Sequence, residues 1–280
     1  MIRDTTIGAK LWATAVWVIV GFFILNLFAM VGTVVVSSFS TRWLRSWLPA
    51  GYTPSWYASA WGEFQLNQVL FVTFQIAFTV VLISAVFGVT AAYAMARREF
   101  PGKRLVMLLF LLPLLVPPIT FGIPLATVLY KIGLGGTFWG VVLANLVPTI
   151  PFVILIMIPF IEQIDPKIEA AARVFGANTW KLFFFVLLPL LLPGILASLL
   201  IVLVRTLAMF ELTFFTSGPS SQTLVVALYY AVFAAGVRAV QSIDAMAVIY
   251  MGTTLIWLLI ALRFINPTQL VTRVKREARA

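Results

Sequence analysis

One stretch of the chain decides its fold class: IGLGGTFWGVVLANLVPTIPFVILIMIPFI, residues 132–161, has no charged side chain. A helix needs about 20 apolar residues to cross the hydrocarbon layer of a membrane, so this stretch can span one. Five more uncharged runs lie on either side of it: Leu11 to Thr41, Phe64 to Ala96, Leu105 to Tyr130, Leu182 to Val204 and Ala245 to Leu262. The sequence therefore predicts an all-α protein with six transmembrane helices.

Composition agrees with a membrane location. Of 280 residues, 62% are hydrophobic and only 10% are charged, and the mean hydropathy is +1.07. Soluble domains keep about 25% of their residues charged, because their surface faces water. A chain with under half of that fraction must place much of its surface in lipid.

The chain contains neither Cys nor His. Disulfides, thiolate metal sites and a Cys nucleophile are therefore excluded. The commonest metal ligand and general base is also absent. We expect no metal site, no cofactor and no catalytic residues, so the chain is predicted not to be an enzyme.

The formal charge of +10 sits in short clusters between the apolar runs, which favours membrane anchoring over nucleic-acid binding. With six spans and the N-terminus inside, fourteen of the nineteen basic residues fall on the side of the two termini. Cytoplasmic loops of membrane proteins carry this excess of Lys and Arg. Both termini are therefore predicted to be cytoplasmic.

Two further patterns concern the spans. Small residues recur every four positions at Ser84, Gly88, Ala92 and Ala96, a stripe that lets a second helix approach closely. The uncharged run Leu212 to Val237 opens with polar and turn residues, so we interpret it as a loop plus a short helix that does not span. A seventh span is the alternative.

The segment between the fourth and fifth spans reads DPKIEAAARVFGAN, residues 165–178. Asp165 is a good helix N-cap, Pro166 suits the first helical position and Gly176 suits the left-handed stop. Ile168, Ala171, Ala172 and Phe175 are spaced three and four apart and form an apolar face, and Glu169 and Arg173 are predicted to pair at i,i+4. From these residues alone, docking onto another protein and lying on the membrane surface are equally favoured.

This segment resembles the EAA loop of binding-protein-dependent ABC importer permeases: Glu-Ala-Ala, three residues, Gly, nine residues, then Ile-x-Leu-Pro. Counted from Gly176, the pattern ends on Val186 to Pro189. In that family the loop couples the permease to an ATPase, which implies this role for Glu169, Ala170, Ala171, Ala172, Arg173, Gly176 and Pro189. The family's Glu falls on Ala170, so either Glu169 reaches the ATPase from another angle or that pair is absent.

The resemblance continues outside this loop. Residues 97–104 are similar to the R-x-F-P-G-K turn of carbohydrate-type permeases, and residues 132–140 to their GL-x-x-T-x-x-G turn. These motifs imply a sugar or a polyol as the solute, with a polyamine or another organic solute as the alternative. At Ala208 to Leu212, only Glu211 matches the Trp-Asn-Glu-Phe of sugar permeases, and their usual C-terminal ending is missing.

The resemblance also implies a type I ABC importer permease fold and a set of partners. Residues 1–63 would form an N-terminal helix and outer loop, 64–266 a five-helix core containing the coupling loop 162–181, and 267–280 a basic tail. The implied partners are two ATPase subunits, a second and preferably different permease subunit, and an extracytoplasmic solute-binding protein, in the inner membrane of a bacterium. Because Gly102-Lys103 lacks the rest of a phosphate-binding loop, ATP hydrolysis is assigned to the separate subunits.

Three residues are candidates for the translocation path: Glu211, Asn145 and Thr120. A carboxylate at membrane depth usually faces a cavity or has a partner, so Glu211 is interpreted either as a structural pair or as a solute contact. An ion-coupled secondary transporter would need more titratable groups inside its spans than Glu211 and Asp244. A membrane-embedded enzyme would need a cluster of catalytic residues, which the sequence lacks.

Overall fold

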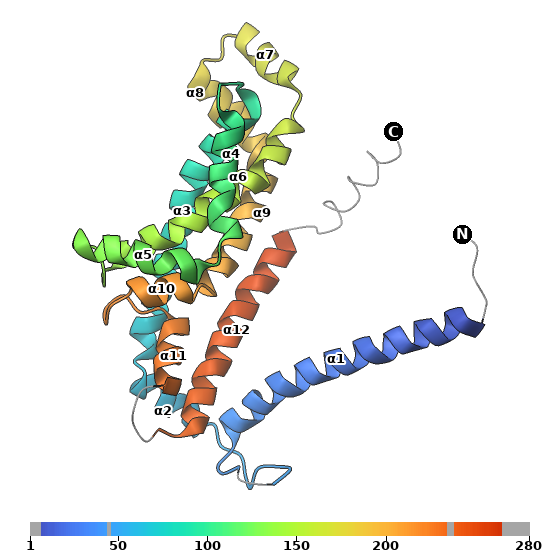
Figure 1. Ribbon diagram of the computed structural model, residues 1–280, viewed down its shortest axis with the longest axis vertical. Coiled ribbons are helices and arrows are strands. Elements are labelled where there is room, and N and C mark those ends of the chain that lie inside the picture. Colours follow the sequence, from blue (N-terminus) through green and yellow to red (C-terminus); the bar gives the residue numbers. More distant parts are fainter. Residues whose placement is uncertain (1–6, 44–45, 234–237, 265–280) are drawn as a thin grey trace. The chain divides into compact units, whose positions relative to one another are not determined.

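The computed structural model describes residues 7–43, 46–233 and 238–264, and every named element among them is a helix (Figure 1). The predicted all-α class is confirmed for this part of the chain. The chain divides into two compact units, residues 1–65 with 231–249 and residues 66–230 with 250–280. The predicted basic tail, 267–280, lies outside the described residues.

The first unit contains α1 (Ile7–Phe39), α2 (Ser55–Glu63) and the first turns of α12 (Val240–Phe264). The connection after α1 is closed by the indole N–H of Trp56, which donates to the Ser40 carbonyl at 2.7 Å. The Ser37 hydroxyl donates to the Asp244 carboxylate at 2.5 Å and so links α1 to α12.

The second unit is built on α3 (Leu66–Arg97), α6 (Phe138–Glu162) and α9 (Leu188–Leu207), which share one hydrophobic core. The predicted stripe of small residues lies in this core, because Ser84, Gly88 and Ala92 are buried. A Cβ atom added at Gly88 would come within 2.6 Å of Val153 on α6, so only glycine allows this approach of α3 and α6. Close helix packing along the stripe is therefore confirmed.

The predicted third span is not one straight helix. It divides into α4 (Lys103–Leu115) and α5 (Pro118–Lys131), which meet at a bend of 101°. A residue before proline is pushed out of the helical region, and both Val116 (ψ 131°) and Pro117 (ψ 134°) precede a proline and are extended. The two successive prolines, Pro117 and Pro118, therefore break the predicted third span into two helices.

The remaining elements of this unit are short. α7 (Pro166–Val174) and α8 (Thr179–Lys181) precede a six-residue π-helical segment, η1 (Leu182–Leu187), which continues into α9. α10 (Glu211–Thr216) and α11 (Leu224–Phe233) follow α9, and they agree with the predicted loop plus non-spanning helix.

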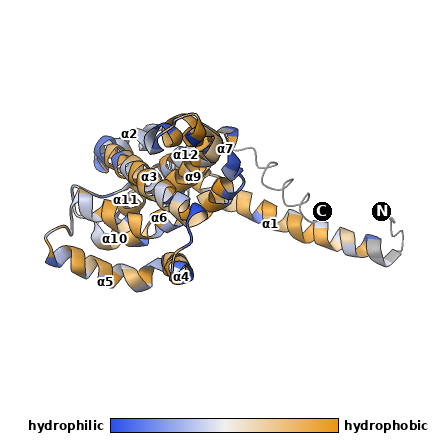
Figure 2. Ribbon diagram, turned by 90° about the horizontal axis from the view of Figure 1, so that it is seen from above, coloured by the Kyte–Doolittle hydropathy of each residue, from blue (hydrophilic) through white to orange (hydrophobic). Residues whose placement is uncertain are grey.

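In the described residues, five helices are long and apolar enough to cross a membrane, and the bent pair α4–α5 brings the number to six. The long helices are hydrophobic along most of their length, whereas hydrophilic residues gather in the connections (Figure 2). The six-span expectation is met on the condition that the bent pair counts as one span.

Candidate functional site

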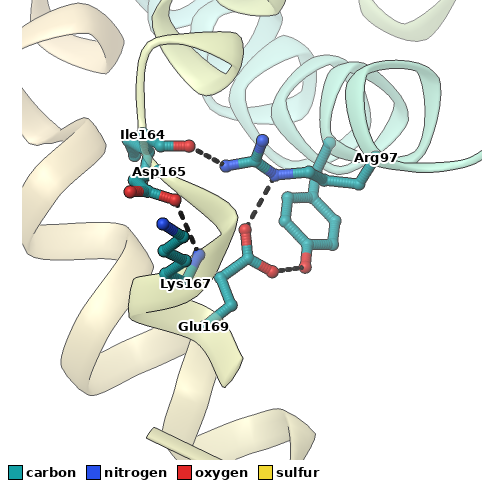
Figure 3. Close-up of polar contacts among 6 residues, drawn as sticks. Arg97, Ile164, Asp165, Lys167 and Glu169 are labelled. Atoms are coloured by element: carbon teal, nitrogen blue, oxygen red, sulfur yellow. Dashed lines mark hydrogen bonds and ion pairs between the residues drawn. The ribbon is translucent and has the colours of Figure 1, made fainter. Parts of the chain in front are cut away.

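The predicted N-terminal cap of the loop helix is present. The Asp165 carboxylate accepts a hydrogen bond from the backbone N–H of Lys167 at 2.9 Å, and Pro166 is the first residue of α7 (Figure 3). The cap satisfies one of the backbone donors that every helix start leaves free.

The helix ends as the sequence predicts. Gly176 has φ +84°, a left-handed conformation that residues with a Cβ rarely adopt. The N–H of Ala177 donates to the carbonyl of Ala172, and that of Gly176 to the carbonyl of Arg173, each at 3.0 Å. This pair of bonds is the Schellman motif. Both ends of α7 are therefore fixed by local interactions.

Glu169 points into the protein. Its side chain is buried, and its carboxylate accepts hydrogen bonds from Arg97 Nε at 2.7 Å and from the Tyr93 hydroxyl at 2.6 Å. Arg97 also donates through Nη2 to the carbonyl of Ile164 at 2.6 Å (Figure 3). A buried charge is costly unless it is paired and hydrogen-bonded, and here both carboxylate oxygens are satisfied. We call Tyr93, Arg97 and Glu169 the α3–α7 latch.

The predicted partner of Glu169 was wrong. Within the described residues, no ion pair joins Glu169 to Arg173, and the cation that Glu169 contacts is Arg97, 72 positions earlier in the sequence. Tyr93 and Arg97 were missed as site residues. Both lie on the last turns of α3, spaced i,i+4, so they present two donors on one helix face. This i,i+4 spacing of a tyrosine and an arginine was the sequence pattern that could have indicated a site on α3.

The opposite side of α7 is exposed and partly apolar. Val174 is 85% exposed and Phe175 90% exposed, and Ile168 and Ala171 are exposed as well. We call these four residues the α7 outer face. Of the predicted apolar face, Ala172 instead packs against the hydrophobic core.

Four further predicted coupling residues are also exposed: Ala170, where the family pattern places Glu, Arg173, Gly176, and Pro189 near the start of α9. The structure therefore places every predicted coupling residue except Glu169 and Ala172 on the exposed surface.

The three candidates for the translocation path lie in different settings. Asn145 is buried, and its amide donates to the Val141 carbonyl at 2.9 Å and to the Thr213 hydroxyl at 3.3 Å, which joins α6 to α10. Thr120 is exposed in the first turn of α5. Glu211 is half-buried as the first residue of α10.

The turn before α6 requires glycine at position 140, the last residue of the GL-x-x-T-x-x-G pattern. Thr137 caps α6 by accepting the N–H of Gly140 at 3.1 Å. A Cβ atom at Gly140 would lie 2.1 Å from the Leu134 carbonyl oxygen, so this turn closes only with glycine there.

A family model described as "Binding-protein-dependent transport system inner membrane component" matches residues 84–276, which include α7 and the latch residues. The chain belongs to this family. It is therefore a permease subunit of an ABC importer, a transport subunit and not an enzyme.

Curated relatives of this permease are named after different solutes. It is 35% identical over 158 residues to "Sulfate permease 2, chloroplastic" of Chlamydomonas reinhardtii, across 52% of this chain and 43% of that protein. It is 33% identical over 178 residues to "Molybdenum transport system permease protein ModB" of Escherichia coli (strain K12), across 58% and 78%. A third relative is "Diacetylchitobiose uptake system permease protein NgcG" of Streptomyces coelicolor (strain ATCC BAA-471 / A3(2) / M145), with 29% identity over 187 residues, across 67% and 60%.

Among solved structures, the permease resembles a chain of a bacterial ABC transporter involved in the import of the acidic polysaccharide alginate. The TM-score is 0.76 at 16% identity, over 95% of this chain and 100% of that chain. A second structure, of a bacterial alginate ABC transporter in complex with alginate pentasaccharide-bound periplasmic protein, gives 0.66 at 17% identity, over 91% and 93%. These matches support the type I ABC importer permease fold.

Proposed function

We propose that this permease couples ATP hydrolysis to solute import through α7, whose outer face docks into a groove of a cytoplasmic ATPase subunit. The observation that carries the proposal is the exposure of Val174 and Phe175 on a short, doubly capped helix. Large apolar side chains exposed at a polar loop mark an interaction site. A helix that presents anchors three and four residues apart is suited to a groove.

The contacts of the latch indicate which residues of α7 would face the ATPase. Glu169 is bound to Arg97 and Tyr93 within the same subunit, so the ATPase is met by the α7 outer face and the exposed Ala170, Arg173 and Gly176. Closure of two ATPase subunits would push on α7, and the latch would pass this displacement to α3. Alternating access then follows from rocking of one helix bundle against another.

The complete importer would contain two ATPase subunits, a second permease subunit of different sequence, and an extracytoplasmic solute-binding protein. The proposed location is a bacterial inner membrane with both termini in the cytoplasm, which the distribution of Lys and Arg supports. The cargo is proposed to be a small polar solute, a sugar or a polyol, with a polyamine or another organic solute as the alternative. Glu211 and Thr120 would line its path, and Asn145 would hold α10 in place through Thr213.

Phe175→Asp tests the docking role. Phe175 is 90% exposed, so the change should leave folding intact. Losing an aromatic anchor at the centre of an interface costs about 2 kcal/mol or more, a roughly 30-fold loss of affinity. Co-purification of the ATPase and solute-stimulated ATP hydrolysis should both fall.

Trp47→Asp is the matched control, because Trp47 is 98% exposed in the connection between α1 and α2. It should co-purify as much ATPase as the wild type. If Phe175→Asp also retains full ATPase binding and stimulation, α7 is not the docking helix and the proposal is wrong.

A further inference from the structure

A cavity of about 620 Å³ lies where the end of α1 meets the start of α12 (Figure 1). All of its lining residues belong to the first compact unit. Its volume is within the range of about 300–1,000 Å³ that small-molecule sites occupy. We call it the α1–α12 pocket. Two opposite charges, two indole rings and further polar groups line it, from Ser37, Arg42, Trp43, Trp56, Gln241 and Asp244.

The two charged side chains of the pocket lack a countercharge. Arg42 is exposed and Asp244 half-buried, and among the described residues neither forms an ion pair, with the other or with a third group. Ser37 donates a hydrogen bond to Oδ2 of Asp244, and no described residue donates to Oδ1. A charge withdrawn from water is costly unless an opposite charge meets it. The pocket therefore offers a place for an anion at Arg42 and for a cation at Asp244.

The uncharged lining suits the same pair of groups. The indole N–H of Trp56 donates to the Ser40 carbonyl at 2.7 Å, and that of Trp43 to the Ser46 carbonyl at 2.9 Å. With both N–H groups occupied, the two indoles offer a ligand their rings. The face of an indole ring attracts an ammonium group within about 6 Å of its centroid. The pocket is thus complementary to a zwitterion, with a cationic ammonium and an anionic group in one small molecule.

The pocket lies at the ends of two membrane spans. Arg42 follows the last residue of α1 by three positions, and Asp244 lies four residues after the start of α12, about 6 Å along that helix. Indole rings are enriched at this level, where the lipid headgroups begin. Farther into the α1 span, Phe28 and Met30 are 69% and 68% exposed. An apolar surface therefore continues from the pocket along α1, and a ligand with a zwitterionic head and apolar chains matches both.

We propose that the α1–α12 pocket binds the headgroup of a phospholipid of the phosphoethanolamine kind. Arg42 binds the phosphate through its guanidinium, and Oδ1 of Asp244 accepts a hydrogen bond from the ammonium, beside the rings of Trp43 and Trp56. The acyl chains lie along the exposed apolar side chains of α1. The bound lipid joins α1 to α12 next to the hydrogen bond between Ser37 and Asp244.

The two charges disfavour other headgroups. A phosphoglycerol lipid carries the phosphate but has no cation for Asp244. A phosphocholine lipid has a cation that the indole rings attract, but its trimethylammonium group has no N–H to donate to the carboxylate. We therefore expect phosphoethanolamine to bind most tightly, phosphocholine less tightly and phosphoglycerol least. A free zwitterionic solute has the same two charges but lacks the chains that lie along α1.

Native mass spectrometry of the complex purified through a tag on this permease tests the order. The complex is titrated with phosphatidylethanolamine, phosphatidylcholine and phosphatidylglycerol that carry identical acyl chains. Phosphatidylethanolamine should bind at least tenfold more tightly than phosphatidylglycerol and about threefold more tightly than phosphatidylcholine. Equal affinities for phosphatidylethanolamine and phosphatidylglycerol overturn the inference. So does an equal affinity for glycerophosphoethanolamine, the headgroup without chains, because the pocket then takes a free solute.

Two variants assign the two charges of the headgroup. Asp244→Asn should weaken phosphatidylethanolamine binding about tenfold and remove its advantage over phosphatidylglycerol, because only the ammonium needs the carboxylate. Arg42→Gln should weaken both lipids about tenfold, because both contain the phosphate. Arg263→Gln, at an exposed arginine in the last turn of α12, is the matched control and should bind both lipids as the wild type does.

Ser37→Ala separates binding from structure. It removes the hydrogen bond between α1 and α12 but keeps the charge of Asp244, so the preference for phosphatidylethanolamine should stay within about twofold of the wild type. If Ser37→Ala erases the preference as Asp244→Asn does, the carboxylate acts through the helix contact and the inference is wrong. Bound lipid is read here, not ATP hydrolysis, so failure of α7 to dock onto an ATPase leaves this test unaffected.

Discussion

Glu169 and Glu211 each lie in the first turn of a short helix in the same compact unit, but their surroundings are opposite. Glu169 is 9% exposed, and both its oxygens are held by Arg97 and Tyr93. Glu211 is half-buried as the first residue of α10, and no hydrogen bond or ion pair joins it to a described residue. A carboxylate satisfied by its own chain holds two helices together, whereas the carboxylate of Glu211 has no such structural task among the described residues.

The largest change in stability is expected when the cation of the latch, Arg97, is removed. Arg97→Met leaves the Glu169 carboxylate buried and uncompensated, and it should lower the free energy of unfolding by about 3–5 kcal/mol. Thermal unfolding in detergent would report this loss. The double variant Arg97→Met with Glu169→Gln should recover much of it, because the buried charge is then gone.

Lys103→Met is the control for the latch variant. It breaks the Lys103–Glu99 pair, which is also 2.7 Å long, but Glu99 is 89% exposed. An exposed pair contributes about 0–1 kcal/mol. If Arg97→Met destabilises the protein no more than Lys103→Met, the latch is not a buried ion pair in solution.

A smaller effect is expected from Tyr93→Phe, which removes one hydrogen bond to Glu169 and keeps the ring. A hydrogen bond to a charged group contributes about 1.5–3 kcal/mol. We expect a loss of stability in this range, together with weaker coupling between solute and ATP hydrolysis, measured as the stimulated ATPase rate. Full stability with normal coupling would show that Arg97 alone holds Glu169.

The smallest effect on stability is expected at the other carboxylate. Glu211→Gln removes no hydrogen bond or ion pair to a described residue, so the free energy of unfolding should change by no more than about 0.5 kcal/mol. Solute uptake should nevertheless fall. A large loss of stability would mean that Glu211 has a structural partner in the assembled importer, and the contrast with Glu169 would disappear.

The fold and the local shape of α7 were predictable because the signals are local. Uncharged runs define the spans, and Asp165, Pro166 and Gly176 act within a few residues of the helix that they limit. The stripe at Gly88 was also visible, since its period equals that of the helix. In each case the pattern can be seen within one short stretch of the sequence, although the neighbour that Gly88 meets, Val153, lies on another helix.

What escaped prediction depends on contacts between distant residues. The partner of Glu169 lies 72 positions away on α3, and periodicity within α7 pointed to Arg173 instead. Ring contacts of Phe210 and Phe214 with Tyr229 join α10 and α11, whose packing no single segment of sequence specifies. The prolines at 117 and 118 indicated a break in the third span, but not that α5 then packs against α10 so closely that a Cβ atom at Gly122 would lie 3.2 Å from Leu212 and 3.1 Å from Phe215.

The latch gives α3 the properties of a lever. Arg97 is the last residue of a helix of 32 residues, about 48 Å long at 1.5 Å per residue, and it holds α7 at one end. If α7 and α3 turn as one rigid body, a tilt of roughly 10° at the latch displaces the far end of α3 by about 8 Å. A rotation too small to change any helix internally can therefore open or close a passage at the opposite side of the membrane.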